Sequence, residues 1–322
     1  MKNTIAENKA IARSLIKKLI YFDIFSYPLS PEEAVLYCNY PNLTMEEGLN
    51  VLQMLKQKSL INYKAGFYFL GTDVTKIYKR LEDNILANKR MKTAKKYAAL
   101  ISNFPYVRAV LISGSLSKNV MKPDSDIDFF LITKPDRLWV CRAILTLFKK
   151  IFLGNSYRNF CLNYFIDTNS LEIPDKNLYT ATEIALLLPM YNYPMYQKFM
   201  HANNWHYAEY PNIGLRPENV KIKPFLVIKK TMEYLMNNGI GDWLDHKCMA
   251  IISGFWQKKF NQFDEKHFSL NLRSKKNVSK HHPNDYQERT LKSYAEKVLS
   301  FEQTTGFRLS QSTKKIPLYR EQ

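Results

Sequence analysis

The residues best suited to chemistry lie between Leu111 and Thr133, in the stretch LISGSLSKNVMKPDSDIDFFLIT. Gly114 directly follows an apolar run that is typical of a β-strand. A glycine there permits a tight turn and lets backbone N–H groups approach a phosphate. Ser115 adds a hydroxyl donor to the same turn. These two residues therefore predict an anion-binding turn at the end of a strand.

Two carboxylates follow this turn with a spacing of two residues. Asp126 and Asp128 would point to the same face of a strand, whereas Ile127 and Phe129 would point to the core. Adjacent carboxylates repel each other, and Mg²⁺ relieves the repulsion by binding carboxylate and phosphate oxygens. Two such ions can clamp an in-line phosphoryl displacement. The alternative, a polar turn at a strand edge, fits Asp124 but not Asp128, which precedes an apolar run.

This segment resembles the signature of the polymerase-β-type nucleotidyltransferase superfamily, Gly-Ser followed by Asp-x-Asp, in its minimal form. The resemblance implies that Gly114 and Ser115 hold the triphosphate tail of an NTP. It also implies that Asp126 and Asp128 bind Mg²⁺, with two ions expected.

Other groups in the same turn could also reach the nucleotide phosphates. Ser117 and Lys118 follow Ser115 closely, and Lys122 lies a little further along the chain. We include Ser117 and Lys118 in the predicted nucleotide-binding set. The alternative is that the lysines are only solvated loop residues.

The superfamily usually supplies a third carboxylate from a later strand, as a base or a metal ligand. The expected strand, residues 160–166, instead offers Asn163, which can bind a cation but cannot accept a proton. Asp167 and Glu172 lie just beyond and could substitute. An acid in the position of Asp167 could equally cap the exit of the strand. We assign the role of the third carboxylate to Asn163 or Asp167. Catalytic turnover is therefore less firmly predicted than the binding of nucleotide and Mg²⁺.

The elements around these residues predict an α+β fold in three parts. Residues 1–75 predict a winged-helix-like module, residues 76–179 a nucleotidyltransferase core with a small mixed sheet, and residues 180–322 a helical C-terminal domain. In the core, strands at 107–112 and 127–132 precede the strand at 160–166, with helices between and before them. In the C-terminal part, residues 273–284 read as a mobile, basic, histidine-containing loop.

The first part shows three helices followed by a hairpin, which is the element order of a winged helix. Ser30 and Thr44 are expected to cap the second and third helices, and a turn is expected at residues 64–66. A DNA-reading third helix would begin with Glu46 and Glu47, which match a phosphate backbone poorly. A packing or protein-contact module is the favoured alternative.

The wider chain resembles an uncharacterised bacterial group in which a winged-helix-like segment precedes this type of core. The residues that carry this resemblance are 21–28, 137–139, 161–164, 204–205 and 211–212.

Charge and cysteine usage set outer limits on function. With 47 Lys and Arg against 29 Asp and Glu, the net charge is +18. Such a surface attracts nucleotides, nucleic acid or anionic lipid, although a biased genome composition also enriches lysine. The four cysteines are scattered, which indicates reduced thiols and favours a cytoplasmic location. No transmembrane segment is predicted, because no apolar stretch is long enough to cross a bilayer.

The predicted activity is Mg²⁺-dependent transfer of a nucleoside monophosphate from an NTP to an unknown acceptor hydroxyl, with release of pyrophosphate. One alternative is an inactive nucleotide-binding regulator that acts through the winged-helix-like module. Another is a basic peripheral membrane or assembly protein. Apart from the positive charge, nothing in the sequence favours nucleic acid as a partner. The sequence does not indicate the oligomeric state.

Overall fold

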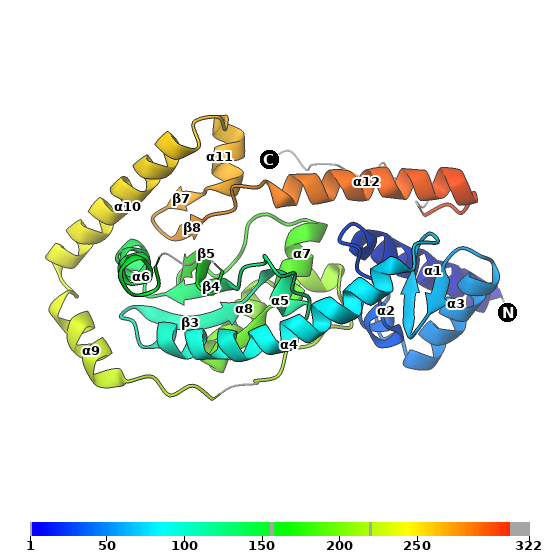
Figure 1. Ribbon diagram of the computed structural model, residues 1–322, viewed down its shortest axis with the longest axis horizontal. Helices are drawn as coiled ribbons and strands as arrows, with labels where there is room; N and C mark the ends of the chain where they lie inside the picture. Colours follow the sequence, from blue (N-terminus) through cyan, green and yellow to red (C-terminus); the bar gives the residue numbers. More distant parts are fainter. Residues whose placement is uncertain (1, 155–157, 219–220, 310–322) are drawn as a thin grey trace.

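The computed structural model describes residues 2–154, 158–218 and 221–309 (Figure 1). Its first part consists of three helices and a two-stranded hairpin: α1 (Lys2–Asp23), α2 (Pro31–Tyr37), α3 (Met45–Gln57), β1 (Asn62–Lys64) and β2 (Phe67–Phe69). Capping boxes at Ser30 and Thr44 begin α2 and α3, as predicted. Ala65 and Gly66 form the hairpin turn with positive φ angles of 48° and 86°. The predicted order of elements is therefore confirmed, whereas a winged-helix role stays a prediction.

A six-stranded mixed sheet forms the centre of the molecule. Its strands are β3 (Val107–Ile112), β4 (Asp128–Thr133), β5 (Cys161–Asp167), β6 (Leu188–Tyr191), β7 (Ser274–Lys275) and β8 (Val278–Lys280). They are ordered β6-β3-β4-β5-β8-β7, with β4 parallel to β5 and all other neighbours antiparallel. The predicted mixed sheet is confirmed, and its three central strands lie within one residue of the predicted ranges.

Helices cover both faces of this sheet because side chains alternate along its strands. Phe129 and Leu131 pack on the face covered by α4 (Thr75–Ser102), α6 (Leu138–Phe152) and α10 (Gly239–Lys259). Phe130 and Ile132 pack on the opposite face, against α7 (Leu178–Ala185) and α8 (Tyr193–Ala202). The remaining helices are α5 (Gly114–Ser117), η1 (Asn204–Ala208), α9 (Leu226–Leu235), α11 (Glu265–Asn271) and α12 (Tyr286–Thr305).

The long helix α12 returns from the sheet to the N-terminal part of the molecule. It contacts both α7 and α1, so the last described helix packs beside the first (Figure 1). Across the residues that the structure describes, none of the helices has the length and apolar character needed to traverse a bilayer.

The C-terminal part is less purely helical than the sequence predicted. Strands β6, β7 and β8 come from beyond residue 179 and join the central sheet, so a boundary at residue 180 does not separate sheet from helices. The prediction of a mobile loop at residues 273–284 was wrong, because β7 and β8 form a hairpin there. Val278 and Ser279 are buried and pair with Ile166 and Phe165 of β5. The lysine-rich sequence of β7 and β8 gives no local strand signal, because these strands are stabilised by pairing with each other and with β5.

Candidate functional site

The turn after β3 closes directly against the first residue of β4. Gly114 has a φ angle of +67°, and a Cβ placed on it would lie 2.2 Å from Oδ2 of Asp128. The main-chain N–H of Ser113 donates to the main-chain carbonyl of Asp128 over 3.0 Å. Antiparallel pairing of Ile112 with Phe129 brings the two segments together. Only glycine satisfies both the backbone angle and the close approach, so the predicted turn and carboxylate form one site.

Asp128 carries the most perturbed carboxyl group of this corner. Burial raises the pKa of Asp128 to about 7, and the negative charges of Asp126 and Glu183 add to the rise. Two groups lower the pKa of Asp128 in part: the Cys161 thiol, which donates a hydrogen bond, and the Lys118 ammonium. Ionising Asp128 therefore costs free energy until a positive charge approaches. A divalent cation would supply that charge, which is the chemistry predicted for Asp126 and Asp128.

Asp126 lies just before β4, is half-buried, and is acted on by the charges of two basic side chains. Burial raises its pKa, as does the neighbouring charge of Asp124, whereas Arg90 and Lys149 lower it. Arg90 comes from α4 and Lys149 from α6, which cover the same face of the sheet. The acids are therefore flanked by cations that would attract a polyphosphate.

The other predicted residues of the turn are engaged in holding its shape. The Ser117 hydroxyl donates to the Gly114 carbonyl over 2.8 Å, and the Lys118 ammonium donates to the same carbonyl over 2.9 Å. Lys118 also forms an ion pair with Glu183 at 2.8 Å. The main-chain carbonyl of Ser115 accepts the N–H groups of Lys118 and Val120, whereas its hydroxyl, among the described residues, makes a single hydrogen bond, over 3.4 Å to the sulfur of Met121. The Ser115 hydroxyl is therefore the one least committed to the turn.

Asn163 lies where the sequence placed it, beside the first carboxylate of β4. Its side-chain amide donates to Oδ1 of Asp128 over 3.1 Å, and its main-chain carbonyl accepts the N–H of His281 over 3.0 Å. Across the described ranges, no three His, Cys, Asp or Glu ligand atoms of this corner come within 4.8 Å of one another. Asn163 is thus in direct hydrogen-bond contact with the Asp128 carboxylate.

Asp167 does not belong to this site, which corrects the prediction. It pairs with Thr133 at the far end of β4 and β5, five residues from the end where Asp128 pairs with Cys161. At about 3.3 Å per residue, that separation is roughly 17 Å. Oδ1 of Asp167 accepts the N–H of Asn169 over 3.0 Å. Asp167 therefore caps the exit of its strand, the alternative that the sequence had left open.

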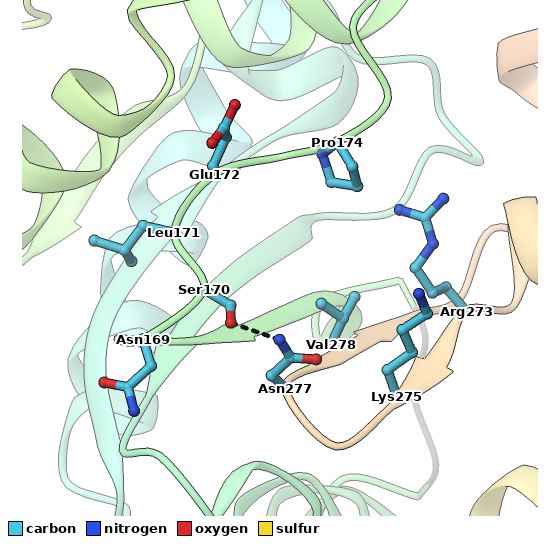
Figure 2. Close-up of a pocket in the computed structure, with 9 residues that line it drawn as sticks. All are labelled: Asn169, Ser170, Leu171, Glu172, Pro174, Arg273, Lys275, Asn277 and Val278. Carbon is cyan, nitrogen blue, oxygen red and sulfur yellow. Dashed lines mark hydrogen bonds between the residues drawn. The ribbon is translucent and has the colours of Figure 1, made fainter. Parts of the chain in front are cut away.

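A cavity of about 300 Å³ opens at this far end of the sheet and is also separate from the site. Figure 2 shows it between the segment that follows β5 and the β7–β8 hairpin, which a Ser170–Asn277 hydrogen bond joins. Glu172, the other acid proposed as a substitute, lines this cavity and pairs with Lys176. Both substitutes for the third acid thus lie away from Asp128.

Two contacts of the site were not predicted from the sequence. Glu183 is the only charged residue between Leu178 and Met190, an isolated acid whose position could have signalled a role. The hydroxyl of Tyr27 donates to the Lys118 carbonyl over 2.8 Å and lies 2.9 Å from Oε1 of Glu33. No local pattern reveals this second contact, because 91 residues separate Tyr27 from Lys118.

Comparison with known families agrees with this geometry. Residues 95–192 match the nucleotidyltransferase domain family, a range that includes β3 to β6 together with the Gly114 turn, Asp126, Asp128 and Asn163. The match supports a nucleotidyltransferase domain in this part of the chain and NTP as its class of substrate, as the sequence predicted. No curated protein and no solved structure gave a match.

Proposed function

We propose that this protein transfers a nucleoside monophosphate from an NTP to an acceptor hydroxyl and releases pyrophosphate. The acceptor oxygen forms a bond to the α-phosphorus while the bond from that phosphorus to the bridging oxygen of the β-phosphate breaks. The acceptor proton passes to a base. The contact of the Gly114 turn with Asp128, inside the segment that matches the family, carries the proposal.

Two carboxylates are suited to hold Mg²⁺ in this reaction. Asp126 and Asp128 both have raised pKa values in the absence of a cation, so they fit a divalent ion that compensates their charges. A bound Mg²⁺ would neutralise phosphate charge and orient the phosphates. Asn163 would keep Asp128 oriented through its 3.1 Å hydrogen bond.

The basic and hydroxyl groups around the turn suit the triphosphate. Gly114 allows the backbone to approach it, and Ser115 adds a hydroxyl donor. Lys118 would exchange its bond to Glu183 for a phosphate oxygen, because a phosphate carries more charge than a carboxylate. Arg90 would add positive charge on the side of α4.

Glu183 is the acid that we propose to accept the proton of the acceptor. Asn163 cannot do so at neutral pH, and Asp167 lies at the other end of its strand. Glu183 is linked through Lys118 to the carbonyl of Gly114, whose turn contacts Asp128. When the ammonium of Lys118 turns to the phosphates, the carboxylate of Glu183 becomes available as a base.

Transfer of label tests the reaction directly. The protein would be incubated with each α-labelled NTP and Mg²⁺, with cell extract as the source of acceptors. We expect label on an acceptor with the parent protein and none with Asp126→Ala/Asp128→Ala. Glu183→Gln should lower the transfer rate by about 10²-fold or more, whereas Glu172→Gln, at the far cavity, should not.

Two results would contradict the proposal. If the parent transfers no label although it binds NTP, the protein is a nucleotide-binding protein and not a transferase. If the Asp126→Ala/Asp128→Ala variant transfers label as fast as the parent, the activity does not arise at this site. The labelled product would also identify the chemical class of the acceptor.

A further inference from the structure

Three metal-ligating side chains meet at a second place, where α11 packs beside the start of α12. His267, Asp285 and Glu288 each offer one ligand atom, and these atoms all lie within 4.8 Å of one another. Nε2 of His267 is 3.4 Å from Oε2 of Glu288. Ligand bonds of about 2.0–2.2 Å around one tetrahedral ion give donor separations of roughly 3.3–3.6 Å. The spacing of this pair therefore already suits a shared ion.

The imidazole of His267 is held in the orientation that a metal ligand requires. Its Nδ1 lies 2.8 Å from Oδ2 of Asp264, the residue whose Oδ1 caps α11 by accepting the His267 N–H over 2.7 Å. A proton on Nδ1 would leave the lone pair of Nε2 directed toward the two acids. A carboxylate that binds the far nitrogen of a ligating histidine fixes its tautomer and raises its basicity.

The second ligand is positioned from outside the group in the same way. Asn271 of α11 donates its side-chain N–H to Oδ1 of Asp285 over 2.9 Å, which fixes the orientation of this carboxylate. Asp285 has a left-handed backbone with a φ angle of 49° at the N-cap of α12. Glu288 follows three residues later in the first turn of that helix. Each ligand thus has a defined support.

The charges of this cluster favour a cation. Asp264, Asp285 and Glu288 place three carboxylates around one imidazole, on a chain whose net charge is +18. Lys280, whose ammonium lies 3.6 Å from Asp175, also interacts with Asp285 through its charge. A divalent ion would neutralise the excess negative charge better than one protonated imidazole does.

We propose that His267, Asp285 and Glu288 bind one Zn²⁺-class ion, with water completing the coordination. One imidazole and two carboxylates suit Zn²⁺, whereas Mg²⁺ prefers oxygen ligands alone. The ion would fasten α11 to α12 on both sides of the β7–β8 hairpin. The residue after this hairpin, His281, donates to the carbonyl of Asn163 beside Asp128. The ion would therefore stabilise the border of the proposed catalytic corner.

Zinc titration by calorimetry tests this site without reference to activity. Untagged full-length protein would be stripped with EDTA and titrated with ZnCl₂ in the Asp126→Ala/Asp128→Ala background, so that the catalytic carboxylates do not contribute. We expect one Zn²⁺ per chain. His267→Ala should weaken binding by 100-fold or more, and Asp264→Asn by about tenfold. The matched control is His246→Ala, which removes an exposed histidine of α10.

Circular dichroism keeps the outcome interpretable, since a variant that has lost its fold would lose binding for a trivial reason. Asp264→Asn leaves all three ligands in place and should keep the fold. Weaker Zn²⁺ binding by this variant would therefore show that Asp264 orients His267 as a ligand. Co²⁺ substitution should give visible absorption bands that His267→Ala removes. The proposal is overturned if no stoichiometric Zn²⁺ binds, or if His267→Ala binds it as tightly as its parent. The cluster would then be an ion pair of a protonated histidine.

Discussion

At the scale of single residues, the site depends on the close contact between Gly114 and Asp128. We expect Gly114→Ala to destabilise the protein by about 2–4 kcal/mol, because it combines a left-handed backbone with a Cβ 2.2 Å from the carboxylate. NTP binding should be lost as well, since the turn must move. Gly71→Ala is a matched control: its φ angle is +70°, and nothing lies within 4 Å of its Cβ. Urea unfolding that gives both variants the same cost would show that the contact is unimportant.

The raised pKa of Asp128 predicts a stability that depends on pH. Its ordinary pKa is 3.8 and its folded value is about 7, so the folded state holds the proton more tightly. Stability without metal therefore falls as the pH rises from about 4 to 7 and stays lowered above that range. Asp128→Asn carries no such cost, and it should be more stable than the parent by about 4 kcal/mol at pH 8 but by little at pH 4.

Chemical unfolding in EDTA at both pH values measures this difference. Asparagine can still accept the hydrogen bond from Asn163, so the substitution isolates the charge. Asp124→Asn is the control, because Asp124 is exposed. A stabilisation of Asp128→Asn that is equal at pH 4 and pH 8 would contradict the assigned cause.

At this scale, sequence reasoning found residues that act within one local segment. Gly114, Asp126 and Asp128 lie within 15 positions, and a strand–turn–strand unit is enough to bring them together. Asn163 was also found, because its parallel strand had a recognisable apolar pattern. Asp167 was misplaced because a strand predicted without its pairing register does not show which of its ends faces Asp128.

At the scale of elements, the N-terminal part of the chain supports the nucleotide turn directly. The hydroxyl of Tyr27, between α1 and α2, donates to the carbonyl of Lys118 next to α5. The ring of Tyr27 also lies 3.4 Å from the Arg80 guanidinium carbon, and Arg80 pairs with Glu33 at 2.7 Å. These contacts connect the segment from α1 to α2 with α4 and with the turn after β3.

We therefore expect Tyr27→Phe to cost about 1–2 kcal/mol of stability and to weaken NTP binding several-fold. The ring packing is kept, but the Lys118 carbonyl loses its donor and the turn becomes less ordered. Calorimetric titration with NTP and urea unfolding give the two readouts. Tyr63→Phe in the exposed strand β1 is the control. If Tyr27→Phe loses stability but binds NTP normally, the contact is structural only.

Sequence patterns predicted the elements with strong local signals and missed those that depend on partners. The capping boxes at Ser30 and Thr44 and the hairpin turn at Ala65–Gly66 were found because short-range hydrogen bonds and backbone angles determine them. Strand β6 was read as part of the helical C-terminal domain, because the run from Ile184 to Leu188 is apolar throughout. Strands β7 and β8 have too few residues to show a period, and they are held in the sheet by pairing, β8 with β5 and β7 with β8.

At the scale of the whole molecule, the two ends of the described chain are fastened to each other. Helix α12 packs on α1, and α4 runs from the N-terminal part to the sheet (Figure 1). Asp23, the last residue of α1, forms ion pairs of 2.6 Å with Lys76 of α4 and with Lys297 of α12. One largely buried carboxylate thus bridges two lysines from helices far apart in sequence. No local pattern could have revealed this junction, because the three residues span 274 positions.

We expect Asp23→Asn to lower the free energy of unfolding by about 2 kcal/mol, because it leaves two neighbouring ammonium groups without their shared counter-ion. High salt should reduce this loss only in part, since the Asp23 side chain is 11% exposed and shielded from ions. Glu172→Gln is the matched control, because it removes an ion pair whose partners are both more than half exposed and should change little. Urea unfolding of both variants at low and high salt measures the difference. If Asp23→Asn is as harmless as Glu172→Gln, apolar packing alone holds α12 against α1, and the junction contributes no stability.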